Sequence, residues 1–458
     1  MRKKGAVKMR RGIGAKMIRG NRIWKKGITL LGAAVLILTL AGVLGGCSAG
    51  TAKTGNTDPL WTASGQSRNK TIVISDLHLG VDDAYAETVK NRPLLVEFLK
   101  RVEKTSDVEE LVIAGDFLDE WYLPVSYPAY SDSAAFYQKV IANNKTVIDA
   151  LNGVMKSGVK LVYVPGNHDM TLEAAVLDKA LPGIVQARDV DGLGVYTTGT
   201  KGNIAIEHGH RYDAFSAPDT VSNAALTGSD KTILPPGYFY ARYAATWVTE
   251  GRPSVTKSYP AIDTAPDKAD ADQYGAYLYY RMLSAEFTRM TPKEGFADKI
   301  FNLKIAGFNG SYSVEDLYPV VQADGTISAP VLYKNFQRSW EARQTANKVG
   351  VPVSFETSVM GALGYEFAAS QAKAQYLENT GKAVDVVVFG HTHIPQYLDL
   401  GNGKLYINSG TWVDNNTSDK DGMTRTFAVI TKGSSATGAL YQYGEDSSVT
   451  DVSQKVVR

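Results

Sequence analysis

Ala114-Gly115-Asp116-Phe117-Leu118-Asp119-Glu120-Trp121 is the stretch on which the interpretation of this sequence depends. It contains the end of the apolar run of residues 110–114, which has the composition of a buried β-strand. A strand that runs into Gly115-Asp116 puts a carboxylate at its C-terminal edge, where open α/β sheets place their ligands. Four other segments, far apart in the sequence, also follow strand-like runs and carry residues that bind metals.

Segments with the character of strands and helices alternate around this stretch. Short β-branched runs predict strands at residues 71–75, 110–114 and 160–164. Apolar residues with helical spacing predict helices at residues 86–104 and 134–156. Further strands are predicted at residues 203–207, 385–389, 405–408, 427–430 and 440–443, and the last two are expected to form a hairpin. This order predicts βαβ units and, beyond them, two sheets packed between helices.

The composition describes a globular protein with an acidic body. Of the 458 residues, 44% are hydrophobic and 21% are charged, which suits one large or two ordinary domains. The net charge of +2 is misleading, because residues 1–46 hold eleven Lys and Arg and no acidic residue. The remainder has 38 basic and 47 acidic residues, a net charge of −9. No nucleic-acid partner is therefore expected, since such proteins carry a basic surface.

The N-terminus has the pattern of an export signal. A basic region precedes an apolar run at residues 28–44, which ends in Leu44-Gly45-Gly46-Cys47. Cys47 is the only cysteine, so the chain forms no internal disulfide. The junction resembles the lipobox of bacterial lipoproteins, which implies lipidation of Cys47 and a lipid-anchored location on the extracytoplasmic face of the cell membrane. An uncleaved signal anchor is the alternative, and it places the body on the same side.

Composition also divides the chain into segments. We predict a lipoprotein signal peptide at residues 1–46 and a flexible tether, rich in small polar residues, at residues 47–70. A catalytic core would comprise residues 71–211 and 376–458. Residues 212–375, rich in Tyr and interrupted by Pro and Gly, would form an inserted cap, although they could instead extend the core. Within them, residues 273–283 are predicted to be helical, and residues 238–247 to be buried in a core.

All six histidines of the chain lie in or beside the five segments that follow strand-like runs. The segments are Asp76-Leu77-His78, Gly115-Asp116-Phe117-Leu118-Asp119, Gly166-Asn167-His168-Asp169, His208-Gly209-His210 and Gly390-His391-Thr392-His393. Histidines used only for packing or surface polarity would be scattered along the chain. Mixed carboxylate, imidazole and amide ligands suit Mn, Fe or Zn better than Mg or Ca, which prefer oxygen alone.

In their order and spacing, these segments resemble the motifs of the calcineurin-like metallophosphoesterase superfamily. The resemblance runs from Asp76 to His393 and implies a four-layer α/β/β/α sandwich with a large insertion before the last motif. It implies two divalent metal ions, a hydroxide between them that attacks phosphorus, and a phosphorylated small molecule as substrate. The chain would thus be a phosphoester hydrolase.

The resemblance also implies a role for each motif residue. Asp76, His78 and His393 would bind one metal, and Asn167, His208 and His391 the other. Asp116 would bridge both metals. His168 would protonate the leaving group or stabilise the phosphoryl group, and Asp119 would orient His168.

Three residues in or beside the motifs have two alternative roles each. His210 would either contact the substrate or support the ligands from behind, and the sequence does not favour one of these. Arg211 would either face the phosphate or have an ordinary surface role. Asp169 would orient a neighbour or cap the following helix, and we favour capping. The turn Asn408-Ser409-Gly410-Thr411-Trp412 is expected to support the site.

Among the branches of the superfamily, the motifs are most similar to those of the one that contains UDP-diacylglucosamine hydrolase, in which a Trp such as Trp121 follows the second motif. Two departures argue against the same substrate: this chain has His168 where that hydrolase has Arg, and its insertion is much longer. An exported protein would also not meet a cytoplasmic lipid intermediate. Two alternatives to a monoester hydrolase remain: an enzyme for small phosphodiesters or nucleotide pyrophosphates, and a non-catalytic binding lipoprotein on the same scaffold.

Overall fold

A computed structural model describes residues 68–228, 231–254, 259–293, 296–362 and 364–456. The predicted signal peptide, Cys47 and nearly all of the predicted tether lie outside the described residues. None of the helices in the described part of the chain has the length and apolar character that a bilayer crossing requires.

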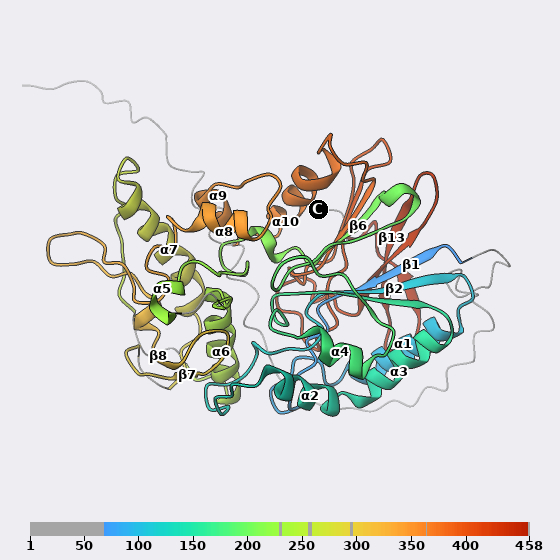
Figure 1. The fold of residues 1–458 in the computed structure, drawn as a ribbon, viewed down its shortest axis with the longest axis horizontal. Coiled ribbons are helices and arrows are strands. Elements are labelled where there is room, and N and C mark those ends of the chain that lie inside the picture. Colours follow the sequence, from blue (N-terminus) through green and yellow to red (C-terminus); the bar gives the residue numbers. More distant parts are fainter. Residues whose placement is uncertain (1–67, 229–230, 255–258, 294–295, 363, 457–458) are drawn as a thin grey trace, which may run out of the picture. The chain divides into compact units, whose positions relative to one another are not determined.

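Two sheets form the centre of the fold (Figure 1). The first has seven strands in the order β14 (Val449–Asp451), β13 (Thr437–Tyr443), β12 (Thr426–Thr431), β1 (Lys70–Ile74), β2 (Val108–Ala114), β3 (Lys160–Val164) and β4 (Val185–Gln186). The second has five, in the order β10 (Gln396–Asp399), β11 (Leu405–Asn408), β9 (Val386–Phe389), β6 (Ile204–Ile206) and β5 (Tyr196–Thr198). The predicted C-terminal hairpin is confirmed, because β12 and β13 pair antiparallel.

Helices cover the outer face of each sheet, which confirms the four-layer arrangement. The seven-stranded sheet is covered by α1 (Arg92–Lys104), α2 (Ser133–Asn143), α3 (Lys145–Lys156) and α4 (Ala174–Ala180). The five-stranded sheet packs against α10 (Glu366–Ala372) and the turn of π-helix that follows it. Helix α10 thus packs with the five-stranded sheet, although its residues were predicted to belong to the insertion, which was expected to end at residue 375.

Alternation along the central strands explains the layers. In β1, Ile72 and Ile74 pack against the helices, whereas Val73 packs between the two sheets. In β2, Leu111 packs against the helices and Val112 between the sheets. Successive side chains of a strand point to opposite faces, and both faces are buried here, so residues 72–74 of β1 and 111–114 of β2 are apolar without a break.

The helix predicted over residues 134–156 is in fact two helices, α2 and α3, that meet at Asn144. The Asn144 side chain is fully buried and donates hydrogen bonds to the carbonyls of Gly80 and Val140, at 2.9 and 2.8 Å. An asparagine that binds backbone carbonyls in this way competes with regular helical structure. Periodicity alone did not reveal this break.

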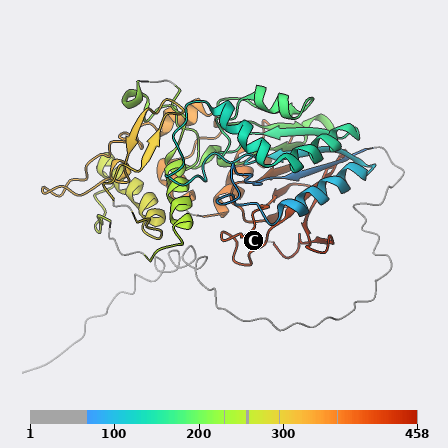
Figure 2. The same cartoon turned by 90° about the horizontal axis from the view of Figure 1, so that it is seen from below.

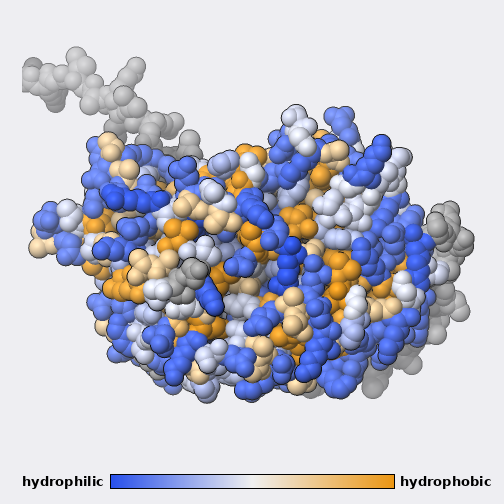
Figure 3. Space-filling view, viewed as in Figure 1, coloured by the Kyte–Doolittle hydropathy of each residue, from blue (hydrophilic) through white to orange (hydrophobic). Residues whose placement is uncertain are grey.

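Most of the rest of the predicted insertion packs around another hydrophobic cluster, which also includes Trp121 and Met170 of the core. It contains α5 (Ala224–Thr227), α6 (Pro236–Thr249), α7 (Ala271–Phe287), the hairpin of β7 (Phe301–Leu303) and β8 (Gly310–Tyr312), α8 (Trp340–Ala346) and α9 (Phe355–Gly361). Figures 1 and 2 both place α6, α7 and the hairpin to one side of the sheets. Residues 238–247 fall in α6, and their aromatic side chains are mostly buried, as predicted. On the face drawn in Figure 3, hydrophobic residues form several groups separated by hydrophilic ones.

Candidate metal centre

Parallel pairing brings the five motifs to one region. Strands β1, β2 and β3 are parallel neighbours, so their C-terminal ends lie on the same edge of the first sheet. Strands β6 and β9 are parallel neighbours in the second sheet. Each motif begins within three residues of a strand end. Residues separated by more than 300 positions therefore contact one another.

Asp76, His78, Asp116 and His393 form the most complete group, in which one potential ligand atom from each residue lies within 4.8 Å of all the others. The Nε2 atoms of His78 and His393 are 2.9 Å apart. His393 Nε2 lies 3.3 Å from Asp76 Oδ1, and His78 Nε2 lies 3.6 Å from Asp116 Oδ2. Nitrogen and oxygen atoms thus converge on one point in the pattern of a metal site.

A second group forms on the other side of Asp116. His208 Nε2 lies 3.2 Å from Asp116 Oδ2 and 3.0 Å from Asn167 Oδ1. The fourth predicted member, His391, instead places its Nε2 atom 3.0 Å from Oδ2 of Asp213. Asp213 is 5% exposed and was not singled out from the sequence. The only available signal was its position five residues after His208.

The donor set of the second group fits a cation. His208 Nδ1 lies 2.8 Å from the carbonyl oxygen of Ala114 and donates to it. This bond leaves the lone pair of a neutral His208 on Nε2, where it faces the oxygens of Asp116 and Asn167. Three electron-pair donors in contact require a positive charge among them, either a proton on His208 or a metal ion.

In the metal-free protein, protons supply this charge. Burial alone would lower the pKa of His78, but the hydrogen bond to Asp119 and the charges of Glu87 and Asp116 outweigh it and raise the pKa to about 10. Burial likewise opposes charge on His208, and the carboxylates of Asp116 and Asp76 raise its pKa to about 9. Metal binding must displace such protons, because an imidazole ligand has to be neutral.

The backbone is strained at the ligand positions. Asp76, His78, Asp116, His391 and His393 have φ values of 53°, 42°, 50°, 71° and 59°. Side chains other than glycine seldom adopt this region, at a cost of about 1–3 kcal/mol each. Five of the thirteen non-glycine residues with positive φ in the described ranges are predicted ligands. Such concentration is typical of a functional site held in place by the surrounding fold.

The second and third motifs approach each other too closely for a side chain at Gly166. A Cβ atom there would lie 2.2 Å from the backbone nitrogen of Asp116. Asp169 fastens the same contact, because its carboxylate accepts hydrogen bonds of 2.7 Å from the backbone N–H groups of Gly166 and Phe117. The interpretation of Asp169 as a helix cap is therefore wrong: α4 begins at Ala174, and the carboxylate joins two motifs instead.

His168 lies beside the predicted metal ligands and is contacted on two sides. Its Nδ1 atom is 2.9 Å from Asp119 Oδ2, the arrangement that the resemblance implied. The same oxygen lies 2.8 Å from Nδ1 of His78, which the sequence did not indicate. The Trp121 ring stacks on the His168 ring, with centroids 4.8 Å apart and planes inclined by 30°. These contacts engage Nδ1 and one face of the His168 ring.

His210 and Arg211 lie behind the site. His210 Nε2 donates to the carbonyl of Gly192 at 3.0 Å, and burial lowers the pKa of this buried ring well below its usual value. The guanidinium of Arg211 is 5% exposed and pairs with Asp189 at 2.6 Å and Glu207 at 3.4 Å. Arg211 is therefore not a surface residue, and its ion pair with Glu207 braces the strand end that carries His208.

The turn after the last motif supports the ligands, as expected. The Thr411 hydroxyl donates to the carbonyl of Asp76 at 2.9 Å, and the Asn408 amide donates to the carbonyl of Gly390 at 2.6 Å. Both contacts fix backbone beside a metal ligand.

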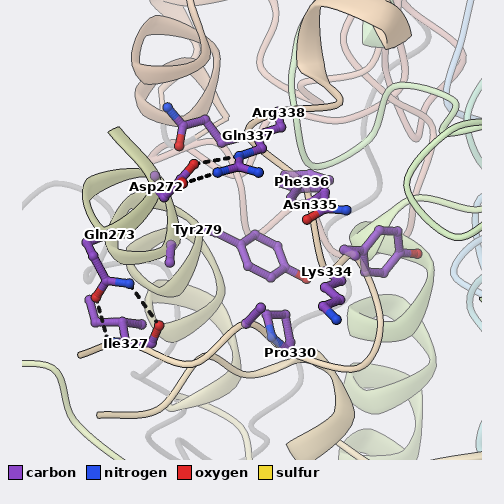
Figure 4. A pocket seen from close by; sticks show the side chains of 14 residues that line it. Asp272, Gln273, Tyr279, Ile327, Pro330, Lys334, Asn335, Phe336, Gln337 and Arg338 are labelled. Atoms are coloured by element: carbon purple, nitrogen blue, oxygen red, sulfur yellow. Dashed lines mark hydrogen bonds and ion pairs between the residues drawn. The ribbon is translucent and has the colours of Figure 1, made fainter. Parts of the chain in front are cut away.

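A cavity of about 210 Å³ lies elsewhere, between α7 and the segment before α8 (Figure 4). The side chain of Gln273 spans one wall through hydrogen bonds to the backbone of Ile327, and Arg338 pairs with Asp272 on another. None of the predicted metal ligands lines this cavity. It belongs to the insertion and is separate from the motif residues.

Residues 70–255 match the model of the family described as calcineurin-like phosphoesterase. The match includes four of the five motifs, and His391 and His393 lie beyond it. The chain thus contains a calcineurin-like phosphoesterase domain, which confirms the prediction of an enzyme that acts on phosphate ester bonds. Among curated proteins, no sequence matches this chain.

Two solved structures are similar to the chain at low identity. A Zn-complexed Vps29 from Entamoeba histolytica shares 10% identity with a TM-score of 0.29, over 83% of this chain and 96% of that one. A dimetal phosphatase from Danio rerio shares 10% identity with a TM-score of 0.30, over 84% and 96%. The family assignment depends on the match of residues 70–255.

Proposed function

We propose that this chain, through its calcineurin-like phosphoesterase domain, is a dinuclear metal-dependent hydrolase of small phosphoesters. The observation that carries the proposal is the convergence of Asp76, His78, Asp116 and His393, with His208 and Asn167 on the far side of Asp116. Two adjacent ligand groups that share one carboxylate are the arrangement that a two-metal site needs.

The ligand groups have distinct tasks in this proposal. Asp76, His78 and His393 would hold one ion, Asn167, His208 and His391 would hold the other, and Asp116 would contact both. Two such ions, when bound, supply an activated water and neutralise charge on the phosphoryl oxygens. Mixed nitrogen and oxygen donors favour Mn, Fe or Zn.

His168 would assist departure of the leaving group. Burial opposes a charge on its ring, but the carboxylates of Asp119 and Asp116 outweigh burial and raise the pKa of His168. Because Nδ1 donates to Asp119, the proton on Nε2 is the one available to the leaving-group oxygen. As that proton is transferred, Asp119 keeps the ring in place.

A substrate panel on the metal-loaded protein tests the proposal. Residues 47–458 would be loaded with Mn or Zn and assayed with nitrophenyl phosphate, bis-nitrophenyl phosphate and a nucleotide diphosphate sugar. Turnover of the monoester with about two metals per chain is expected. Preference for the diester or the pyrophosphate would select one of the alternatives. Binding of metal without turnover of any substrate would favour a non-catalytic protein.

We also propose that Cys47 is lipidated and holds the enzyme on the extracytoplasmic face of the membrane. The basic region, the apolar run and the position of the lone cysteine support this. The Cys47→Ala variant should fail to be processed or should leave the membrane fraction. Unchanged fractionation and mature mass would contradict lipidation. We propose that the chain is most similar in its motifs to the branch that contains UDP-diacylglucosamine hydrolase. The substrate of that hydrolase is not carried over, because His168 and the long insertion argue against it.

A further inference from the structure

Helix α6 of the insertion forms hydrogen bonds with the turn that follows the second motif. Arg242 of α6 is 2% exposed, and its guanidinium donates to the carbonyls of Leu123 and Pro124 at 2.7 and 3.1 Å. Thr246, one turn further along α6, accepts a hydrogen bond of 2.8 Å from the backbone N–H of Val125. Three consecutive residues of the catalytic core are thus fixed by two residues of one insertion helix.

Trp121 stands at the start of this turn, between α6 and His168. Its ring is 2% exposed, stacks on His168 and meets the edge of Tyr238, at 6.1 Å between centroids. On the α6 side, a Cβ atom at Gly237 would lie 3.1 Å from the Trp121 ring and 2.9 Å from the carbonyl oxygen of Phe215. Only glycine fits there without displacing a neighbour, so the N-terminus of α6 rests directly on the indole.

The same turn fixes the hydrogen-bond partner of His168. Asp119 Oδ1 accepts from the backbone N–H groups of Trp121 and Tyr122, at 2.7 and 2.8 Å, while Oδ2 contacts His168. The backbone N–H of Glu120 also donates to the carbonyl of His168, at 3.0 Å. Movement of the turn would therefore change both the hydrogen bond to Nδ1 and the stacking against the ring.

We propose that Trp121 is a positioning residue for His168, and that α6 is the brace that holds Trp121 in place. This inference rests on the proposed function of His168. The insertion then takes part in the chemical step through a packed contact of α6, Trp121 and His168. Since His168 acts on the leaving group, loss of this contact should matter most for a leaving group that needs a proton.

The test compares two monoesters on the metal-loaded protein, an alkyl phosphate with a strongly basic leaving group and nitrophenyl phosphate with a weakly basic one. Trp121→Leu should lower kcat for the alkyl phosphate by about 10–100-fold, with KM and metal content unchanged, because a misaimed acid loses most of its contribution. Turnover of nitrophenyl phosphate should fall by less than about threefold. Trp121→Phe, which keeps an aromatic face, should recover most of the loss.

Gly237→Ala disturbs the same contact from the side of the insertion, because the added Cβ would lie 3.1 Å from the Trp121 ring. It should reproduce the selective loss of kcat for the alkyl phosphate in weaker form. Thr249→Ala, an exposed position at the end of the same helix, is the matched control and should leave both rates unchanged. In a His168→Ala background, Trp121→Leu should cause no further loss, because the two residues act as one unit.

Equal losses for both substrates, loss of bound metal, or an undiminished effect of Trp121→Leu in the His168→Ala background would each overturn the proposal. If the unaltered protein binds metal but hydrolyses neither monoester, the proposed function itself fails. That outcome is distinct from all of these, since it is seen before any substitution is made.

Discussion

The two ligand groups of the proposed metal centre, its two halves, share Asp116 but differ in how completely they are assembled. In the first half, Asp76, His78 and His393 converge with Asp116. In the second, His208 contacts Asp116, whereas His391 is paired with Asp213. The difference teaches that a histidine at a strand end can meet the other predicted ligands directly or can instead pair with a neighbouring carboxylate. A carboxylate that orients a metal-binding histidine is a common partner in such sites.

Asp116→Asn should have the largest effect, because it touches both halves. Each half loses a charged oxygen, so the transition state should lose several kcal/mol of stabilisation. This loss corresponds to a fall of about 10³-fold or more in kcat/KM. Metal analysis should show fewer than two ions per chain. Two ions at full occupancy would show that Asp116 is not shared.

His168→Ala should lower kcat by about 10²–10⁴-fold, the usual contribution of a general acid. Since His168 belongs to neither ligand group, both metals should remain bound. Metal analysis and single-turnover kinetics on the same preparation separate these effects. Loss of one metal would instead make His168 a ligand.

Asp213→Asn should affect the second half alone. The carboxylate receives Nε2–H of His391, so its replacement should weaken the second metal by about 10–100-fold and leave the first unchanged. Titration with Mn, followed by electron paramagnetic resonance, resolves the two affinities. Asp272→Asn, which alters a carboxylate paired with Arg338 in the insertion, away from both ligand groups, is the matched control and should leave both affinities unchanged. Equal weakening of both sites would contradict the separation of the halves.

The smallest effect, for a change of one pH unit, is expected from pH. The pKa values of about 10 for His78 and about 9 for His208 mean that both rings are protonated at neutral pH without metal. Each ion must displace one proton, so affinity should rise about tenfold per pH unit in each half between pH 6 and 8. Competition with a chelating dye measures this slope. A slope near zero in one half would show that its imidazole is already neutral.

The sequence predicted the central strands more accurately than the edge strands and the helix boundaries. Residues 160–164 were predicted as a strand and coincide with β3, because a run of buried β-branched and aromatic residues has few other uses. The short edge strands β4, β5, β10 and β14 were missed, since they have two to four residues and little apolar pattern. The break at Asn144 was missed because it depends on Gly80, 64 residues away.

The sequence by itself determined which residues could bind metals. Six histidines placed at strand ends beside Asp and Asn leave few other interpretations, because parallel strands bring their C-terminal ends to one edge. Only the tertiary structure decided that Asp213 holds His391, that Asp119 serves both His78 and His168, and that α6 presses Trp121 onto His168. These contacts join segments whose spacing in the chain follows no local period, so they arise only when the sheets and the insertion pack together.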